Sequence, residues 1–250
     1  MRGVLEEGMN NKSHDPEKEA VKRTLESSYC PDAIKQAREK QDSLLRDRLK
    51  HGPYRIADLG CGNGYHAVML APCFYHGFES SPEIAETARA LWQKENVDDA
   101  QVIVGDVAEA EIESSFYDVV LCLYFTPGNF RDKSNDLSLY SNAYLDRDPQ
   151  FIRIVSRFYG ALKTGGSMFL TIYKDVREAQ AAQVDYGEHT GQHVVTSPKS
   201  RFVATAEGFW SARWTKDSML SNLSACGIRS DTVVFNDLNA IAWLVEIIKS

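Results

Sequence analysis

The sequence has few cysteines and no long apolar run, and each absence excludes a class of protein. The first ten residues contain Glu6 and Glu7, where a secretory signal requires an apolar stretch. No apolar run approaches the roughly 20 residues that a bilayer span requires. The five cysteines are scattered and form no C-x-x-C pair, which is unlike a disulfide framework or a zinc site. We therefore expect a soluble protein of a reducing compartment, the cytoplasm. The cysteines are Cys30, Cys61, Cys73, Cys122 and Cys226.

A surplus of basic residues is also missing. The sequence contains 28 Lys and Arg residues and 35 Asp and Glu residues, which gives a net charge of −7. Proteins that bind nucleic acids usually carry basic residues that replace the counterions of the phosphates, so the balance disfavours a nucleic-acid partner. The 250 residues, 43% hydrophobic and 25% charged, are typical of a folded globular domain at the upper end of what one core serves.

The N-terminal segment is predicted to precede the main domain. Residues 1–14 are polar and without periodicity, which predicts a disordered tail. Asp15 and Pro16 form a typical helix start, and residues 32–50 carry an amphipathic pattern that ends at Gly52-Pro53. We expect residues 15–52 to form helices that cover a ligand site on the domain at 53–250.

From Tyr54 onward, short apolar runs alternate with helical stretches. This alternation predicts a parallel, doubly wound α/β sheet with helices on both faces. Near the C-terminus, only four residues separate two strands, so these should pair antiparallel as a hairpin. The predicted strands are 54–59, 74–79, 101–104, 117–124, 167–173, 228–235 and 240–248, and the predicted helices are 64–71, 82–94, 149–162 and 216–226.

The most informative stretch joins the first strand to a helix through three alternating glycines, Gly60, Gly62 and Gly64. Glycine permits a tight turn and a close approach of a ligand to the backbone. A dinucleotide fingerprint, G-x-G-x-x-G, would place its third glycine where Tyr65 stands. Asp58 would also be unfavourable beside a pyrophosphate, whereas a carboxylate suits a ligand that carries an ammonium and a sulfonium.

The D-x-G-x-G-x-G pattern resembles motif I of the class I S-adenosylmethionine-dependent methyltransferases. Later strand ends agree with that family: Glu79 ends the second strand, Gly105-Asp106-Val107 follows the third, and Leu162–Gly166 precedes the fifth. The resemblance covers residues 54–173 and the C-terminal strands. It implies a Rossmann-like seven-stranded sheet, mostly parallel, with an antiparallel last strand.

The resemblance also implies S-adenosyl-L-methionine as cofactor and a set of residues that bind it. Glu79 would accept from the ribose hydroxyls, Asp106 from the adenine amino group, and Tyr29 would cover the cofactor. The implied set is Tyr29, Asp58, Gly60, Cys61, Gly62, Gly64, Glu79, Ser80, Asp106, Val107 and Leu123.

The predicted acceptor site consists of aromatic residues near the carboxyl ends of the fourth and fifth strands, where π faces could also attract a sulfonium. Two long connections, 126–148 and 174–214, are interpreted as lids over this site. The expected reaction transfers a methyl group to N, O or C of a small molecule. The acceptor residues are Tyr124, Phe125, Tyr144, Tyr173 and Trp210.

Several alternatives remain open at this stage. Basic residues such as Arg153, Arg157 and Lys163 could dock a protein or RNA acceptor, and a module that only binds S-adenosylmethionine is also possible. No metal is expected, because no carboxylate or Cys/His cluster has ligand spacing. A catalytic base is not assigned, since only a nucleophile that stays protonated needs one. His66 is interpreted as structural.

Overall fold

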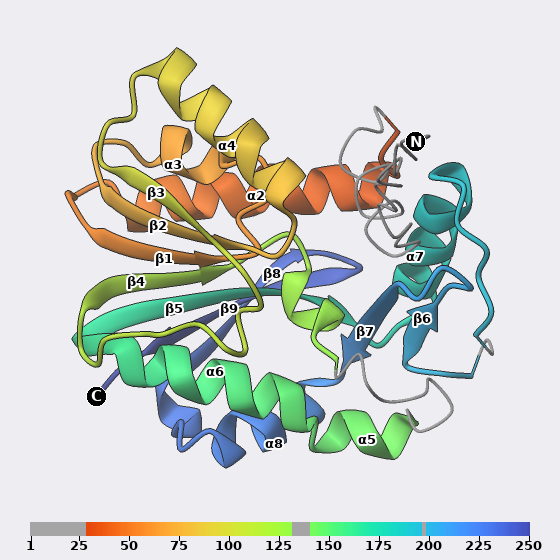
Figure 1. The fold of residues 1–250 in the computed structure, drawn as a ribbon. Helices are drawn as coiled ribbons and strands as arrows, with labels where there is room; N and C mark the ends of the chain where they lie inside the picture. Colours follow the sequence, from red (N-terminus) through yellow and green to blue (C-terminus); the bar gives the residue numbers. More distant parts are fainter. Residues whose placement is uncertain (1–28, 132–140, 197–198) are drawn as a thin grey trace, which may run out of the picture.

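The structure, a computed structural model, describes residues 29–131, 141–196 and 199–250. The predicted tail at 1–14 and the helix start at Asp15 lie outside these residues. One mixed sheet runs through the molecule in the strand order β3-β2-β1-β4-β5, and β5 continues on one side to β9 and β8 and at its end to β7 and β6 (Figure 1).

The elements follow the predicted alternation closely. The strands are β1 (Arg55–Leu59), β2 (Phe74–Glu79), β3 (Ala100–Val104), β4 (Tyr117–Cys122), β5 (Leu162–Lys174), β6 (Phe202–Ala204), β7 (Trp210–Trp214), β8 (Val233–Asn239) and β9 (Ala242–Ile248). The helices are α2 (Asp32–Arg48), α3 (Tyr65–Met69), α4 (Pro82–Glu95), α5 (Asn142–Asp146), α6 (Pro149–Ala161), α7 (Arg177–His189) and α8 (Lys216–Ala225), with short 3-10 turns η1 (Thr126–Asn129) and η3 (Ser230–Thr232). No described helix is long and apolar enough to cross a membrane.

Seven of the strands form the sheet that the resemblance implies. β1, β2, β3, β4 and β5 are parallel, and β9 lies antiparallel to β5 with β8 paired on its far side. The fold class is therefore confirmed. The hairpin register differs from the prediction, because β8 extends through the expected turn to Asn239 and the chain reverses at Ala240 and Ile241.

Helices cover both faces of the sheet and leave the carboxyl ends of the parallel strands to other segments. α2, α3 and α4 lie on one face, and α6 and α8 lie on the other (Figure 1). The helix starts explain these positions: Ser81 caps α4 by accepting the Ile84 N–H, and Asp148 caps α6 by accepting the N–H of Phe151. Each helix then turns an apolar stripe to the sheet.

The segment 174–214 is more regular than predicted. It contains α7 and the antiparallel pair β6–β7, and β7 pairs in parallel with the end of β5 through Tyr173 and Lys174. This extra ribbon extends the sheet beyond the end of β4. Every residue of both strands is buried, including the charged Arg213.

β4 ends two residues earlier than predicted. Tyr124 and Phe125 have φ values of 49° and 69°, a left-handed conformation that non-glycine residues rarely adopt. Two such residues in succession turn the chain sharply away from the sheet into η1. Strained backbone of this kind clusters at functional sites, and here it lies beside the glycine loop.

Candidate active site

The three glycines of the loop between β1 and α3 serve different purposes. A Cβ on Gly60 would lie 2.7 Å from Cγ2 of Thr126, and one on Gly64 would lie 2.5 Å from Nε1 of Trp92. Packing therefore requires glycine at both positions, in addition to their positive φ. A Cβ on Gly62 would meet nothing within 4 Å. Gly62 thus presents bare backbone to open space, as a loop that cradles a ligand requires.

Glu79 lies beside this open glycine at the end of β2. Its carboxylate accepts the N–H of Gly62 at 3.2 Å and the N–H of Ser81 at 2.9 Å, and the exposed Ser80 places Oγ 3.5 Å away. Burial raises the pKa of Glu79, and the backbone hydrogen bonds oppose this effect. Backbone N–H groups therefore fix the carboxylate of Glu79 at the edge of the loop. A fixed acceptor at this place fits the role that the resemblance implies, which is to accept hydrogen bonds from the ribose hydroxyls.

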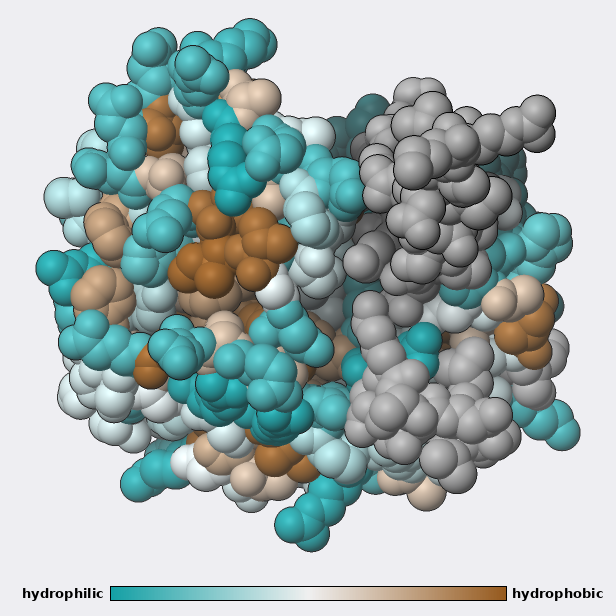
Figure 2. Space-filling model, viewed as in Figure 1, coloured by the Kyte–Doolittle hydropathy of each residue, from teal (hydrophilic) through white to brown (hydrophobic). Residues whose placement is uncertain are grey.

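The end of β3 offers a flat apolar edge next to a carboxylate. Asp106 is exposed and accepts the N–H of Ala108 at 2.8 Å, while Val107 is half-buried beside it. Val104 is 40% exposed, and Figure 2 shows hydrophobic side chains gathered below α4, where β3 forms the edge of the sheet. An apolar surface with one fixed acceptor fits an adenine ring.

Cys61 and Leu123 lie in the core beneath the glycine loop and the end of β4. Both side chains are buried, and a Cβ on Gly77 would lie 2.5 Å from the Cys61 sulfur. Burial, with the charges of Asp58 and Glu79, raises the pKa of the Cys61 thiol. Cys61 is therefore a packing residue whose backbone belongs to the loop, and its thiol is not ionised.

Asp58 does not face open space, contrary to the expectation that it meets the ligand. It is 1% exposed, the hydroxyl of Tyr75 donates to Oδ2, and Nδ1 of His66 lies 3.5 Å from the same oxygen. On the other side of the imidazole, Nε2 lies 3.5 Å from Oδ1 of Asp42 in α2. We call Asp42, His66 and Asp58 the carboxylate–imidazole bridge.

This bridge holds a proton on His66. Burial alone would lower the pKa of His66, but the carboxylates of Asp42 and Asp58, each 3.5 Å from a ring nitrogen, raise it to about 9. Burial raises the pKa of Asp42, but hydrogen bonds from His66, Tyr124 and Gln41 lower it below the usual range. The bridge therefore ties α2 to both flanks of the glycine loop with an imidazolium between two carboxylates.

Three of the five predicted acceptor residues meet beside the loop. The rings of Phe125 and Tyr173 stack at 3.7 Å, and both residues are buried. Tyr124 is half-buried, and its hydroxyl donates to Asp42 at 2.9 Å. Burial, with the charge of Asp42, raises the pKa of Tyr124, so this phenol remains protonated.

Comparison with known proteins identifies the domain around these residues. Residues 56–128 match a family model described as a methyltransferase domain, and this span contains the glycine loop, Glu79, Asp106 and Tyr124. The chain carries a class I S-adenosylmethionine-dependent methyltransferase domain. No curated protein gives a significant match to the whole sequence.

Solved structures share the fold of this methyltransferase at low identity. An S-adenosylmethionine-dependent methyltransferase from Clostridium acetobutylicum has a TM-score of 0.55 at 12% identity, covering 85% of this chain and 92% of that one. Magnesium protoporphyrin IX methyltransferase from Synechocystis has a TM-score of 0.56 at 13% identity, covering 93% and 94%. The 1,6-didemethyltoxoflavin-N1-methyltransferase of Burkholderia thailandensis has a TM-score of 0.55 at 12% identity, covering 100% and 93%.

Two predicted residues of the methyltransferase lie away from the loop. Tyr29 stacks on His189 of α7 at 3.9 Å and donates to Asp185 at 2.5 Å, so it joins the start of α2 to α7 instead of covering the glycines. Trp210 is 2% exposed and packs against Phe202, with ring centroids 4.4 Å apart. Trp210 is therefore a core residue of the β6–β7 ribbon, because that ribbon buries both of its faces.

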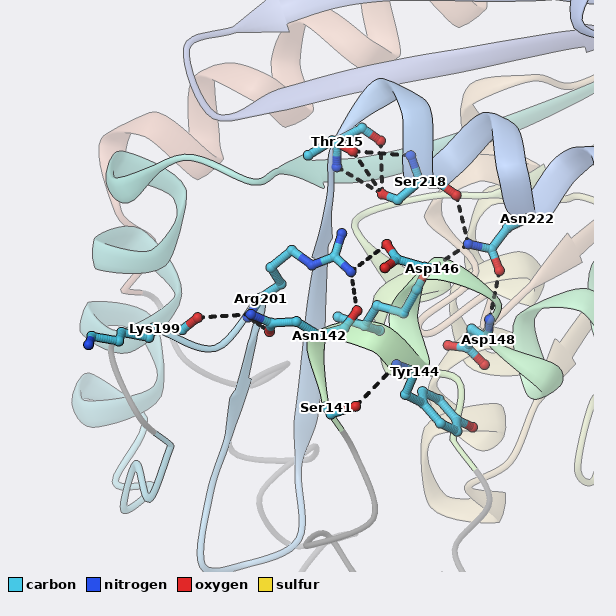
Figure 3. A network of polar contacts seen from close by, with 11 residues as sticks. Ser141, Asn142, Tyr144, Asp146, Asp148, Lys199, Arg201, Thr215, Ser218 and Asn222 are labelled. Atoms are coloured by element: carbon cyan, nitrogen blue, oxygen red, sulfur yellow. Dashed lines mark hydrogen bonds and ion pairs between the residues drawn. The ribbon is translucent and has the colours of Figure 1, made fainter.

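Tyr144, on α5, belongs to a polar network that joins the two predicted lid segments (Figure 3). Its side chain hydrogen-bonds with Asp148. Arg201 donates to Asp146 at 2.6 Å and to the backbone of Asn142, whose amide donates to the carbonyl of Lys199 at 3.1 Å. These contacts join α5 to the irregular stretch that leads into β6.

The residues that sequence reasoning missed lie on α2. Its buried positions are Ile34, Ala37, Gln41, Asp42 and Leu45, so two polar side chains occupy the stripe that faces the sheet. The sequence signal for these residues was a polar side chain within the apolar stripe of the helix. A buried carboxylate is stable only with hydrogen-bond or ionic partners, so such a residue indicates a polar site inside the fold. Among the described residues, no group of three or more His, Cys, Asp or Glu side chains could hold a metal ion.

Proposed function

We propose that this methyltransferase acts on a small molecule and transfers the methyl group to a nucleophilic N, O or C atom. The observation that carries the proposal is an open pocket of about 350 Å³ beside the glycine loop. It is lined by Asn63 and Tyr65 of the loop region, by Tyr124 at the end of β4 and by α2. Small-molecule sites typically have volumes of about 300–1,000 Å³.

The chain's own residues would bind and orient the two reactants. S-adenosylmethionine supplies an electrophilic methyl group on a sulfonium that is already a good leaving group. Gly62, Glu79 and Asp106 would hold the cofactor, and Tyr124 and the stacked pair Phe125–Tyr173 would shape the acceptor side. Alignment and exclusion of water then supply most of the rate acceleration. The high pKa of Tyr124 argues against this phenol as a general base at neutral pH.

A macromolecular acceptor has less support. The basic residues that could dock RNA or protein already have partners within the chain: Arg153 pairs with Glu109 at 2.5 Å, and Lys163 pairs with Asp118 at 2.6 Å. Arg157 donates to the carbonyls of Ala108 and Ala110. These side chains would have to give up internal contacts to bind phosphates.

Release of S-adenosylhomocysteine in the presence of a panel of amines, phenols, carboxylic acids and thiols tests the proposal. Turnover with at least one small molecule, and no stimulation by RNA or unfolded protein, is the expected result. Stimulation by a macromolecule alone would contradict it. Binding of the cofactor without turnover of any acceptor class would favour the module that only binds S-adenosylmethionine.

Once an acceptor is known, the activity is expected to survive EDTA. Alignment of the reactants requires no Lewis acid when the leaving group carries a positive charge. The measurement compares initial rates before and after chelation, with magnesium added back as control. Loss of activity that magnesium restores would contradict the expectation.

A further inference from the structure

Two consecutive buried residues of α2, Gln41 and Asp42, hold the same tyrosine at two points. The side-chain oxygen of Gln41 accepts the backbone N–H of Tyr124 at 3.3 Å, and the carboxylate of Asp42 accepts the hydroxyl of Tyr124 at 2.9 Å. Gln41 is 0% exposed and Asp42 is 7% exposed. α2 therefore fixes both the main chain and the side chain of Tyr124, although Gln41 and Tyr124 lie 83 positions apart in the chain.

The orientation of the Gln41 amide is itself determined by its neighbours. Its oxygen accepts a second hydrogen bond, from the hydroxyl of Thr171 on β5, and its nitrogen donates to Oδ1 of Asp42 at 2.9 Å. An amide accepts and donates at once, whereas an apolar side chain in this stripe would leave the N–H of Tyr124 without this acceptor. Burial of a polar group is unfavourable unless its hydrogen bonds are made, so these contacts explain how an amide is accommodated there.

The residue that Gln41 holds begins a strained turn. Tyr124 and Phe125, which we call the left-handed turn, have φ values of 49° and 69°. Residues other than glycine rarely adopt this conformation, and it persists only where the surroundings impose it. The N–H of Thr126 closes the turn locally by donating to the carbonyl of Leu123 at 3.0 Å. Gln41 adds a contact to the main chain of the turn from a different element, α2.

The left-handed turn contacts both the glycine loop and the pocket. The next residue, Thr126, packs so closely on Gly60 that a Cβ on the glycine would lie 2.7 Å from Cγ2 of the threonine. Tyr124 lines the pocket, and the ring of Phe125 stacks on that of Tyr173 at 3.7 Å. A displacement of the turn would therefore move one wall of the site. Transfer between two bound reactants depends on their alignment, and a misplacement of about 1 Å can lower the rate on the order of 100-fold.

We propose that Gln41 is a positioning residue for methyl transfer, because its side-chain oxygen holds the left-handed turn that shapes the acceptor side of the site. This inference rests on the proposed function, which places the acceptor beside Tyr124 and Phe125. Gln41 is completely buried, so it acts through the turn and not through contact with a reactant. α2 then does more than cover the sheet, since the turn keeps its shape only while this helix is docked.

The hold on the turn is measured by hydrogen exchange of the Tyr124 amide in protein labelled with 15N-tyrosine. The resonance of this amide is identified by its loss in Tyr124→Phe. Gln41→Met keeps the length of the side chain but removes the amide, and it is expected to speed the exchange at least tenfold. Gln36→Met is the matched control, because Gln36 is exposed on the same helix, and it should leave the exchange unchanged. Exchange in Gln41→Met at the wild-type rate would overturn the proposal.

The consequence for methyl transfer is measured with the small molecule that gives the highest rate of S-adenosylhomocysteine release in the acceptor panel. Gln41→Met is expected to lower kcat at least tenfold and to leave the affinity for S-adenosylhomocysteine within threefold, a split that partial unfolding would not produce. Gln41→Glu keeps an oxygen for both donors. Next to the carboxylate of Asp42, the new acid group would stay protonated and donate as the amide does, so this variant should keep most of the rate.

Three results of the rate measurement would overturn the proposal: an unchanged kcat in Gln41→Met, an equal loss of affinity for S-adenosylhomocysteine, or an equal loss of rate in Gln41→Glu. Failure of the proposed function has a different signature. If wild-type protein binds S-adenosylhomocysteine but turns over no small molecule, the proposed function fails and the catalytic role of Gln41 fails with it. If the wild type turns over and Gln41→Met matches it, only the inference about Gln41 fails.

Discussion

Replacement of Glu79 by alanine is expected to weaken the binding of S-adenosylhomocysteine by about 1–3 kcal/mol, or roughly fivefold to 150-fold. The substitution removes the acceptor proposed for the ribose hydroxyls. It also frees the N–H of Gly62, which the carboxylate now holds at 3.2 Å. The loop would therefore lose both a ligand contact and its fixed conformation. Titration calorimetry of the two proteins measures the difference.

A matched control separates this effect from general loss of charge. Glu86, on α4, is exposed and pairs with Arg89 on the same helix. Glu86→Ala removes the same charge from the next helix and should leave the affinity within twofold. The affinity of Glu79→Gln for S-adenosylhomocysteine should lie between those of Glu79→Ala and Glu86→Ala, because the amide oxygen of glutamine can still accept one of the hydrogen bonds. Wild-type affinity in Glu79→Ala would refute the assigned role of this residue.

Replacement of His66 by glutamine is expected to lower the free energy of unfolding by about 3–5 kcal/mol, the usual cost of removing one partner from a buried ion pair. The variant leaves Asp42 and Asp58 buried without the cation between them. Chemical denaturation at pH 7 measures the loss. His51→Gln, at an exposed position after α2, is the control and should cost less than about 0.5 kcal/mol.

The pH dependence gives this prediction a second, independent readout. The pKa of His66 is about 9 in the folded protein, against an ordinary value of 6.5. Because the pKa is raised on folding, the stabilisation is complete below pH 6.5 and is lost as the pH rises through 9. The shift corresponds to about 3 kcal/mol. Wild-type stability should fall over this window relative to His66→Gln, and parallel curves for the two proteins would contradict a protonated His66.

The parallel sheet could be predicted from the sequence because each strand is a short apolar run between helical patterns. The end of β4 could not, since Tyr124 and Phe125 continue the apolar run and only the packing of the turn forces a positive φ. β6 and β7 escaped prediction for a related reason. A three-residue strand such as β6 carries too little periodicity to be distinguished from a loop.

The glycine loop and Glu79 were also predictable, because their chemistry lies in a local motif at a strand end. The carboxylate–imidazole bridge depends on how α2 packs against α3 and β1, and sequence spacing contains no information on that contact. Asp42 and His66 stand 24 positions apart in the chain, and each alone is an ordinary polar residue of a helix. Only in the folded protein are the two side chains buried next to each other, where they form one network with Asp58.

Titration calorimetry of the wild-type protein with S-adenosylhomocysteine, and in parallel with NAD, tests the central claim most directly. The claim is that the glycine loop and Glu79 form a site for S-adenosylmethionine and not for a dinucleotide. The account predicts saturable binding of one S-adenosylhomocysteine per chain and no measurable heat with NAD. Binding of NAD, or the absence of S-adenosylhomocysteine binding by folded protein, would contradict it.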